Sequence, residues 1–320
     1  MSESIDPLDP FASIDIPIGE WINSGMTWVA SNFREIFQSM KVPIQLLLDA
    51  GEQALLGSPP TILLILVGLI AWQTGGVGVA ASVLVPLIVI GLLGIWIEAM
   101  TTLSIVLSSV IVCVTLGIPL GILMSRSDRV QAGIRPVLDL MQTIPSFVYL
   151  VPIVMLFGIG KVPGAVVTII YALPPVIRLT NFGIREVRQD LVEAIRAFGA
   201  NDWQVLWKVQ LPQARPAIMT GVNQTIMHAL GMVVVASMIS VPGLGQLVLR
   251  GIGRLDLGLA TVGGVGIVML AISIDRLSQS FAQTTRQRVS GAGLGSRPLA
   301  MLSSRFRVTM QARNSNHQGG

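Results

Sequence analysis

Charge and cysteine are both scarce in this chain of 320 residues. Only 12% of the residues are charged, against about 25% in a typical soluble domain, whereas 52% are hydrophobic and the mean hydropathy is +0.72. This composition excludes an ordinary soluble globular protein. The single cysteine, Cys113, lies inside an apolar run, which excludes an internal disulfide and fits no metal-ligand spacing.

The sequence also has no phosphate-binding loop and no set of side chains with the spacing of a catalytic centre. We therefore expect neither enzymatic activity nor a cofactor or metal on this chain. The net charge of +4 and the pI of about 9.8 would suit a nucleic-acid-binding protein. However, the basic residues lie in the gaps between apolar runs, where membrane proteins carry their orientation signals, so we expect no nucleic-acid partner.

What the chain does have is a series of apolar runs close to the length of about 20 residues that a helix needs to cross a bilayer. A Gly-rich stretch at 73–78 divides the first and longest run in two. The pattern predicts an all-α polytopic membrane protein with about seven transmembrane helices, at 61–76, 79–97, 101–124, 137–159, 163–179, 217–240 and 259–275. Prolines at 145, 152, 174 and 175 are expected to break the fourth and fifth spans next to protein or a water-filled cavity.

Three regions follow from this pattern. Residues 60–280 form the membrane domain, with residues 125–136 as a short basic loop and residues 180–216 as a polar loop between spans. Residues 1–59 are acidic, and the helix-like alternation over 18–56 predicts one or two interfacial helices; residues 1–15 fit a poorly ordered leader equally well. Residues 281–320 are polar and are expected to be a disordered tail.

The distribution of basic residues predicts the orientation. With seven spans the two termini lie on opposite sides, and all but five of the 21 Lys and Arg residues fall on the side of the C-terminus; the five are Arg34, Lys41, Lys161, Arg250 and Arg254. The positive-inside rule therefore places the 180–216 loop and the C-terminus in the cytoplasm and the N-terminus outside. If residues 61–97 do not span twice, only the N-terminal segment changes sides.

The polar loop reads as two short helices. Asp190 and Glu193 resemble a capping box, and Gly199 is placed where a left-handed residue ends a helix. Asn201 or Asp202 can cap a second helix that carries Trp203 and Trp207 and that Leu211-Pro212 ends. Leu191, Ile195 and Phe198 fall on one face of the first helix. Such exposed apolar and aromatic groups call for a partner, although an amphipathic loop lying on the membrane surface would show the same pattern.

The spacing in this loop resembles the signature of permease subunits of binding-protein-dependent ABC importers. That signature is Glu-Ala-Ala, a Gly six residues after the Glu, and then Ile-x-Leu-Pro. The chain matches at Glu193, Ala194, Gly199, Leu211 and Pro212, and it departs at Ile195 and Val209, where the family has Ala and Ile.

The resemblance implies a type I ABC importer permease fold in a bacterial plasma membrane. It also implies a cytoplasmic coupling helix that docks on a separate ATP-binding subunit, which would hold ATP and Mg²⁺. The coupling residues would be Glu193, Ala194, Phe198, Gly199, Leu211 and Pro212. An extracytoplasmic substrate-binding protein would deliver the substrate, and two copies of the chain would form the pore.

Three further segments, at 145–160, 171–180 and 243–256, are similar to the glycine betaine/proline betaine permease family, and the similarity covers about residues 60–280. The implied substrates are small quaternary-ammonium osmolytes: glycine betaine, proline betaine, choline or carnitine. The candidate translocation path is lined by Gln142, Tyr149, Asn223, Gln224 and His228. Each of these side chains could equally pack helices together.

An ion-coupled secondary transporter or a channel for a small cationic or zwitterionic solute is the alternative. Coupling to Na⁺ or H⁺ favours a carboxylate deep in the bilayer. Glu98, Asp139 and Asp275 all fall near the ends of the predicted spans, which disfavours this alternative.

Overall fold

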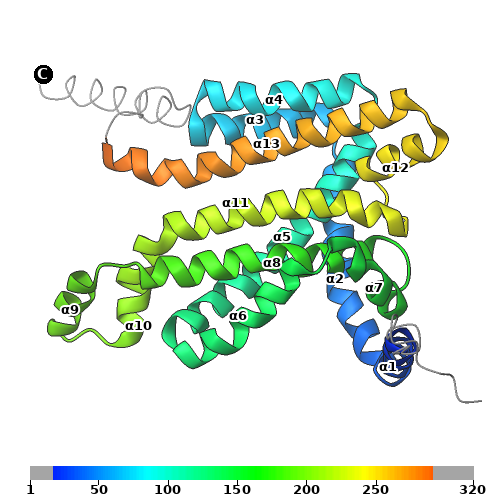
Figure 1. Ribbon diagram of the computed structural model, residues 1–320. Helices are drawn as coiled ribbons and strands as arrows, with labels where there is room; N and C mark the ends of the chain where they lie inside the picture. Colours follow the sequence, from blue (N-terminus) through cyan, green and yellow to red (C-terminus); the bar gives the residue numbers. More distant parts are fainter. Residues whose placement is uncertain (1–16, 291–320) are drawn as a thin grey trace, which may run out of the picture.

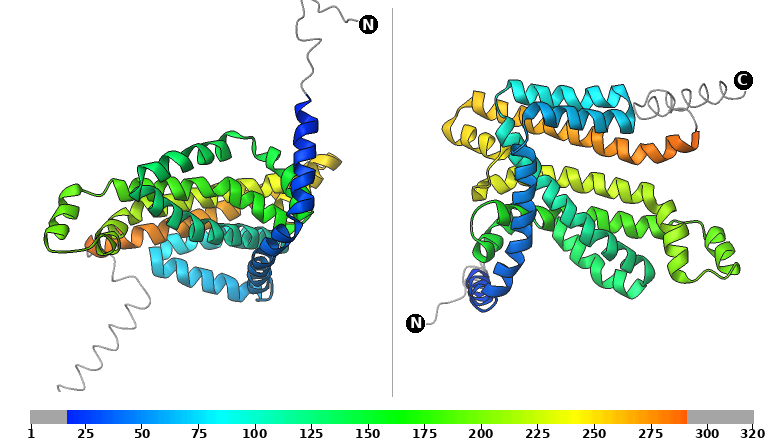
Figure 2. Two further views of the ribbon diagram at one scale, coloured as in Figure 1. Left: turned by 90° about the horizontal axis from the view of Figure 1, so that it is seen from below. Right: turned by 180° about the vertical axis from the view of Figure 1, so that it is seen from behind.

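The computed structural model describes residues 17–290, with side chains up to residue 281, and every element in this part of the chain is helical. Helices α1 (Ile18–Asn32) and α2 (Arg34–Leu56) confirm the helical pattern predicted over 18–56. They lie at one end of the helical bundle and across its axis (Figures 1 and 2). Leu48 of α2 is buried, and Lys161 at the start of α8 (Lys161–Arg185) donates to Glu52 at 2.5 Å, which fixes α2 to the bundle.

Within the described residues, five apolar segments are long enough to cross a membrane, and a bent pair of helices would make a sixth. The five are Pro60–Leu92, Trp96–Arg126, Lys161–Arg185, Asp202–Ile239 and Leu257–Phe281. The central layer consists of α5 (Trp96–Arg126), α8 (Lys161–Arg185) and α11 (Leu211–Ala236). Helix α13 (Leu257–Ser290) packs beside α11, as Figure 1 shows. The chain is thus the polytopic all-α protein that its composition predicts.

The first apolar segment, Pro60–Leu92, is a hairpin and not one straight helix. Its arms, α3 (Pro60–Gly75) and α4 (Val77–Leu92), meet at Gly76, whose φ of 82° reverses the chain. A Cβ on Gly68 would come within 2.9 Å of Leu84 Cδ1, so the arms are in contact. The two arms are the first two predicted spans. Each arm has 16 residues, so the described residues hold five or six spans of full length, and the predicted number of about seven is approximate.

The fourth predicted span, 137–159, is broken at Pro145 as predicted, but its first helix begins earlier, at Asp128, and Pro152 lies within the second helix and does not break it. Helix α6 spans Asp128–Thr143, a 3₁₀ turn covers Ser146–Tyr149, and α7 spans Leu150–Phe157, with a bend of 102° between the two parts. The bend falls before Pro145, which restricts Ile144 to an extended conformation (ψ 128°). Most of the predicted basic loop at 125–136 is therefore helical, and α6 buries Leu138 among Met124, Val176 and Ile177.

The prediction that Pro174-Pro175 breaks the fifth span is also wrong, because α8 continues through both prolines. Each proline removes one backbone hydrogen bond, but packing on both sides supports the helix. A Cβ on Gly117 of α5 would come within 2.4 Å of Val176, and a Cβ on Gly221 of α11 would come within 3.1 Å of the Val176 Cα. Small residues on both neighbours therefore let three helices approach closely around the diproline.

The far end of the chain differs from the prediction as well. Helix α13 continues to Ser290, because the polar residues after Asp275 include no glycine or proline before Gly291. The predicted tail boundary at 281 therefore falls inside a helix. The predicted leader at 1–15 and the remainder of the tail, 291–320, lie outside the described residues.

Candidate functional site: a docking loop and an intramembrane cavity

The loop between α8 and α11 forms a small unit of its own at the opposite end of the bundle from α1 (Figures 1 and 2). It consists of α9 (Gln189–Ala197), α10 (Asp202–Val205) and a π-helical turn (Leu206–Gln210) that leads directly into α11. Four valines form its core: Val187, Val192, Val205 and Val209. Arg126 at the end of α5 donates to the Asp202 carbonyl at 3.2 Å and ties the loop to the bundle.

Two of the predicted capping signals are present, and one is not. Gly199 has a φ of 85°, and Asn201 forms a capping box with Gln204, with hydrogen bonds of 2.8 and 3.1 Å. Asp190, however, is not a cap, because α9 begins one residue earlier. Its carboxylate accepts from the Arg188 side chain, and this hydrogen bond lowers the pKa of Asp190 below its ordinary value.

Leu211-Pro212 does not end the second helix, contrary to prediction. The chain continues helically from Asp202 to Ala236, with the π turn directly before Leu211. Pro212 is tolerated because it lies in the first turn of α11. The π turn directly before it already departs from the α-helical hydrogen-bond pattern. The sixth span therefore begins at the loop itself.

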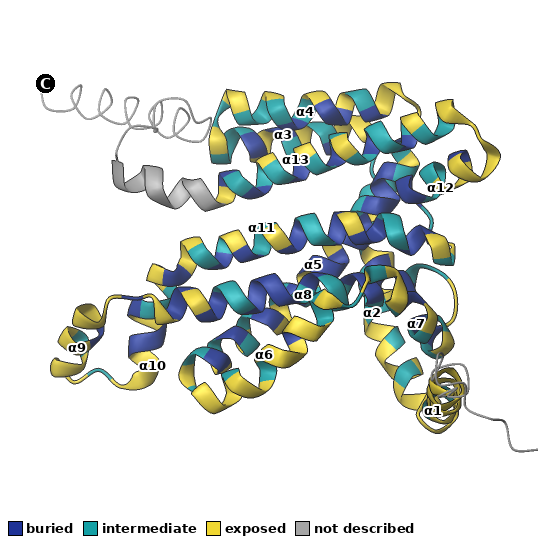
Figure 3. Cartoon of the chain, in the orientation of Figure 1, coloured by how far each residue is buried: buried dark blue, intermediate teal, exposed yellow. Residues whose placement is uncertain are grey.

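The aromatic side chains of the loop point away from the protein. Phe198 is 92% exposed, Trp203 63% and Trp207 53%, and the two tryptophan rings meet edge to face at 5.4 Å. Figure 3 shows α9 and α10 as largely exposed, in contrast to the buried middle of α8. Glu193 and Ala194 are exposed beside them, while Leu211 is half-buried at the base of the loop and Pro212 is exposed. We define Phe198, Trp203 and Trp207 as the aromatic patch.

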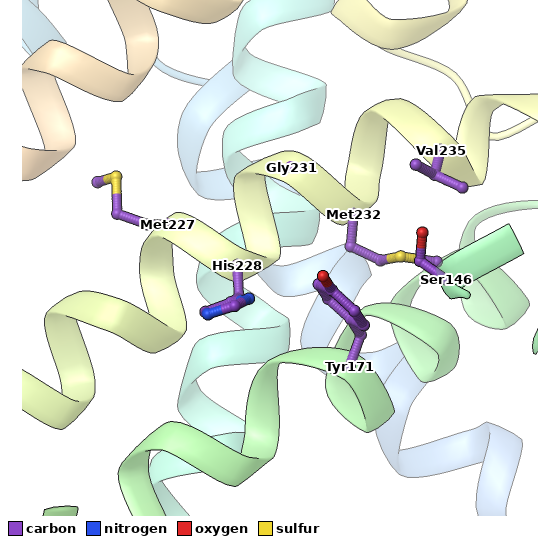
Figure 4. Close-up of a pocket in the computed structure, with 7 residues that line it drawn as sticks. All are labelled: Ser146, Tyr171, Met227, His228, Gly231, Met232 and Val235. Carbon is purple, nitrogen blue, oxygen red and sulfur yellow. The ribbon is translucent and has the colours of Figure 1, made fainter. Parts of the chain in front are cut away.

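Two adjoining cavities lie between α8, α11 and the bent segment. One has a volume of about 350 Å³ and the other about 500 Å³, and Tyr171 and His228 line both. Their rings meet edge to face at 5.4 Å, and Figure 4 shows the two side chains facing each other from neighbouring helices. Gln142 and Gln224 line the larger cavity. Three of the five predicted path residues are thus together.

The other two predicted path residues lie elsewhere. The Tyr149 hydroxyl donates to the Met141 carbonyl at 3.0 Å, because the bend at Pro145 removes the helical phase that would align it with Gln142. Asn223 faces α13, where it donates to Asp275 at 3.2 Å and accepts from Ser278 at 2.9 Å. Since α13 is longer than predicted, Asp275 lies well inside this helix and not at its end.

Two cavity-lining residues were missed by the sequence analysis: Tyr171 and Arg178 of α8. The available signal was their separation of seven residues, two helical turns, on the same helix as the diproline. An arginine inside an apolar run indicates a functional position for the same reason as His228.

With this geometry established, comparison with known proteins assigns the family. Residues 114–289 match the model of the binding-protein-dependent transport system inner membrane component family. The chain belongs to this family. The permease is 55% identical over 304 residues to the glycine betaine/proline betaine transport system permease protein ProW of Escherichia coli (strain K12), covering 95% of this chain and 86% of the relative.

Other relatives agree. The permease is 43% identical over 273 residues to the glycine betaine/carnitine transport permease protein GbuB of Listeria monocytogenes, which is 83% of this chain and 95% of that protein. Among solved structures, an inward-facing MetNI methionine ABC transporter superposes with a TM-score of 0.53 at 21% identity. The superposition covers 57% of this chain and 91% of that chain, and it shows the fold. The predicted family and fold are confirmed: the protein is a multi-pass inner-membrane permease with the fold of an ABC importer. The ion-coupled alternative is not favoured.

Proposed function

We propose that this permease carries glycine betaine, proline betaine and related quaternary-ammonium osmolytes inward by alternating access, driven by ATP that is hydrolysed on a separate subunit. The aromatic patch is the observation that carries the coupling half of this proposal. Three large rings at the tip of a loop that is stabilised by its own valine core form a surface suited to a protein partner.

We expect the loop to move as one unit. Its core, its capping box and the contact of Arg126 with Asp202 hold α9 and α10 in one arrangement. Because the loop leads into α11 without a break, a push on the aromatic patch would move α11 along its contact with α8. The two cavities lie on that contact, so docking and the substrate path are mechanically connected.

We propose a membrane orientation from the two ends of the bundle. Arg126 at the end of α5 contacts the loop at Asp202, and Arg185 at the end of α8 pairs with Asp128. Basic residues thus gather at the end of the bundle where the loop lies, which supports a cytoplasmic position for residues 180–216 and for the end of α13. Helices α1 and α2 lie at the other end, on the outside, where a substrate-binding protein would dock. One loop serves one ATP-binding subunit, so we propose a homodimer with the pore between the copies.

The substrate class is supported by the relatives, whose names specify glycine betaine, proline betaine and carnitine. It is also supported by the cavity, in which the Tyr171 and His228 rings offer aromatic surface to a quaternary ammonium.

Reconstituted vesicles test the proposed function. The permease, the ATP-binding subunit and the binding protein together should accumulate radiolabelled glycine betaine when ATP is supplied on the side of the ATP-binding subunit. Omission of that subunit should abolish uptake. Uptake that persists without it on a Na⁺ or H⁺ gradient would refute the proposal.

A further inference from the structure

The proposed function leaves open how the membrane domain itself distinguishes its cargo. A betaine carries a carboxylate beside its quaternary ammonium, whereas choline carries only the ammonium. The larger cavity, of about 500 Å³, has a different kind of group at each end: the guanidinium of Arg178, and the rings of Tyr171 and His228.

We propose that Arg178 binds the carboxylate of a zwitterionic substrate inside the membrane domain, while the Tyr171–His228 ring pair receives its quaternary ammonium. This inference rests on the proposed function and adds to it a second selection step, independent of the binding protein.

The position of Arg178 is the first argument. It lies seven residues before the end of α8, about 10 Å from it along the helix axis, in a segment apolar enough to cross the membrane. A charged side chain at such a depth is costly, and in membrane proteins it commonly marks a substrate or ion pathway. Arg178 lines the cavity directly.

The partners of Arg178 hold it in place from one side. Its Nη1 donates to Gln142 Oε1 at 2.6 Å, and its Nη2 donates to Asp139 Oδ1 at 2.7 Å, both on α6. Gln142 lines the cavity, whereas Asp139 is not part of the lining and its side chain is 54% exposed. A guanidinium has further N–H donors in a planar fork that matches a carboxylate. The ion pair therefore orients Arg178 and leaves its cavity side to a second anion.

Both ends of the proposed site lie on one face of α8. Tyr171 precedes Arg178 by seven residues, so the two side chains leave the same face of α8 about 10 Å apart, and both are long enough to lean toward each other. Pro175 lies between them on this face and adds no hydrogen-bond donor of its own. Aromatic faces attract quaternary ammonium groups, and the ring pair lies where the two cavities adjoin.

Direct binding to the purified complex of permease and ATP-binding subunit, without the binding protein, tests this assignment. The probes are radiolabelled glycine betaine and choline. Arg178→Gln should weaken glycine betaine binding by about tenfold or more, because a charge-assisted hydrogen-bonded pair is lost, and should change choline binding by less than about threefold. Arg178→Lys should restore part of the preference, since it keeps the charge but loses the fork.

The double variant Asp139→Asn with Arg178→Gln separates binding from a structural role. If Arg178 served only to neutralise Asp139, removal of both charges would restore glycine betaine binding; we expect no restoration. Tyr171→Leu should weaken both probes to a similar extent, because both carry the ammonium. Arg185→Gln, on the same helix but paired with Asp128 outside the cavity, is the matched control and should bind both probes like the wild type.

Each result is informative alone. Equal loss of both probes in Arg178→Gln, recovery in the double variant, or no glycine betaine binding to the wild-type complex would overturn this inference. In the first two cases, ATP-driven uptake by the wild type would leave the proposed function intact. Co-purification of the ATP-binding subunit with each variant shows that it has folded, and Tyr171→Leu still tests the site if Arg178→Gln does not fold.

Discussion

The aromatic patch permits a prediction in which one substitution weakens docking and leaves folding unchanged. Phe198 is 92% exposed, so Phe198→Ala removes almost no contact within the permease. Exposed substitutions of this kind change the free energy of unfolding by no more than about 0.5 kcal/mol. The thermal unfolding of the isolated permease should therefore be the same as that of the wild type.

Docking should respond differently. A Phe side chain that passes from water into a closed pocket contributes about 1.5–3 kcal/mol, and truncation of an aromatic anchor in an interface costs about 2 kcal/mol or more. Since about 1.4 kcal/mol is a factor of ten, Phe198→Ala should weaken the binding of the ATP-binding subunit by about 30-fold. Trp203→Ala should have a similar effect, enlarged by the loss of its ring contact with Trp207.

The assay is the affinity of the ATP-binding subunit for detergent-purified permease, measured beside a thermal melt of each variant. Trp28→Ala is the matched control, because Trp28 is an aromatic residue of α1 that is 60% exposed at the opposite end of the bundle. Wild-type affinity in Phe198→Ala, or an equal loss in Trp28→Ala, would show that the aromatic patch is not the docking surface.

Three further substitutions and one control, Gly133→Ala, test the geometry of the fold and the loop. Gly121→Leu should destabilise the permease by at least about 1–3 kcal/mol in a denaturation assay, because even a Cβ would come within 2.6 Å of Thr180. Gly133→Ala should be neutral or slightly stabilising, because the space around Gly133 is open. Gly199→Val should introduce about 1–2 kcal/mol of backbone strain, because Gly199 has a φ of 85°. This variant should insert into the membrane but show reduced ATP-driven uptake. Full uptake would contradict a fixed loop conformation. Asn201→Ala should remove the capping box at a cost of about 1 kcal/mol, visible as faster amide hydrogen exchange in α10, and unchanged exchange would count against the cap.

Much of the fold could be predicted from the sequence because apolar length is a strong signal in a membrane protein. The errors concern helix continuity. Residues 125–136 were interpreted as a loop because Arg126, Arg129 and Arg135 interrupt the hydropathy, although Ile134, Leu138 and Met141 follow at helical spacing and pack against α5 and α8. A window of mean hydropathy detects a helix that is apolar all round and misses an amphipathic one.

Proline was over-interpreted for a related reason. Local chemistry predicts a break at Pro174-Pro175 and a stop at Pro212, yet α8 and α11 continue through both. Contacts with neighbouring helices, which sequence spacing does not reveal, decide whether the lost hydrogen bonds end a helix.

The same limit applies to the cavity. Gln224 and His228 share one face of α11, but only the fold shows that Asn223, adjacent in sequence, contacts Asp275 on α13.

The hairpin of α3 and α4 has a consequence for the lipid around the permease. Each arm has 16 residues and therefore rises by about 24 Å, whereas the hydrocarbon core of a bilayer is about 30 Å thick. Hydrogen bonds of 2.8 Å between Thr74 and Ser280 and of 3.2 Å from Ser273 to the Val83 carbonyl hold the arms against α13, so the hairpin cannot adjust its depth alone. If each arm crosses the membrane, we expect the bilayer to thin locally at this edge and the activity of the permease to depend on acyl-chain length.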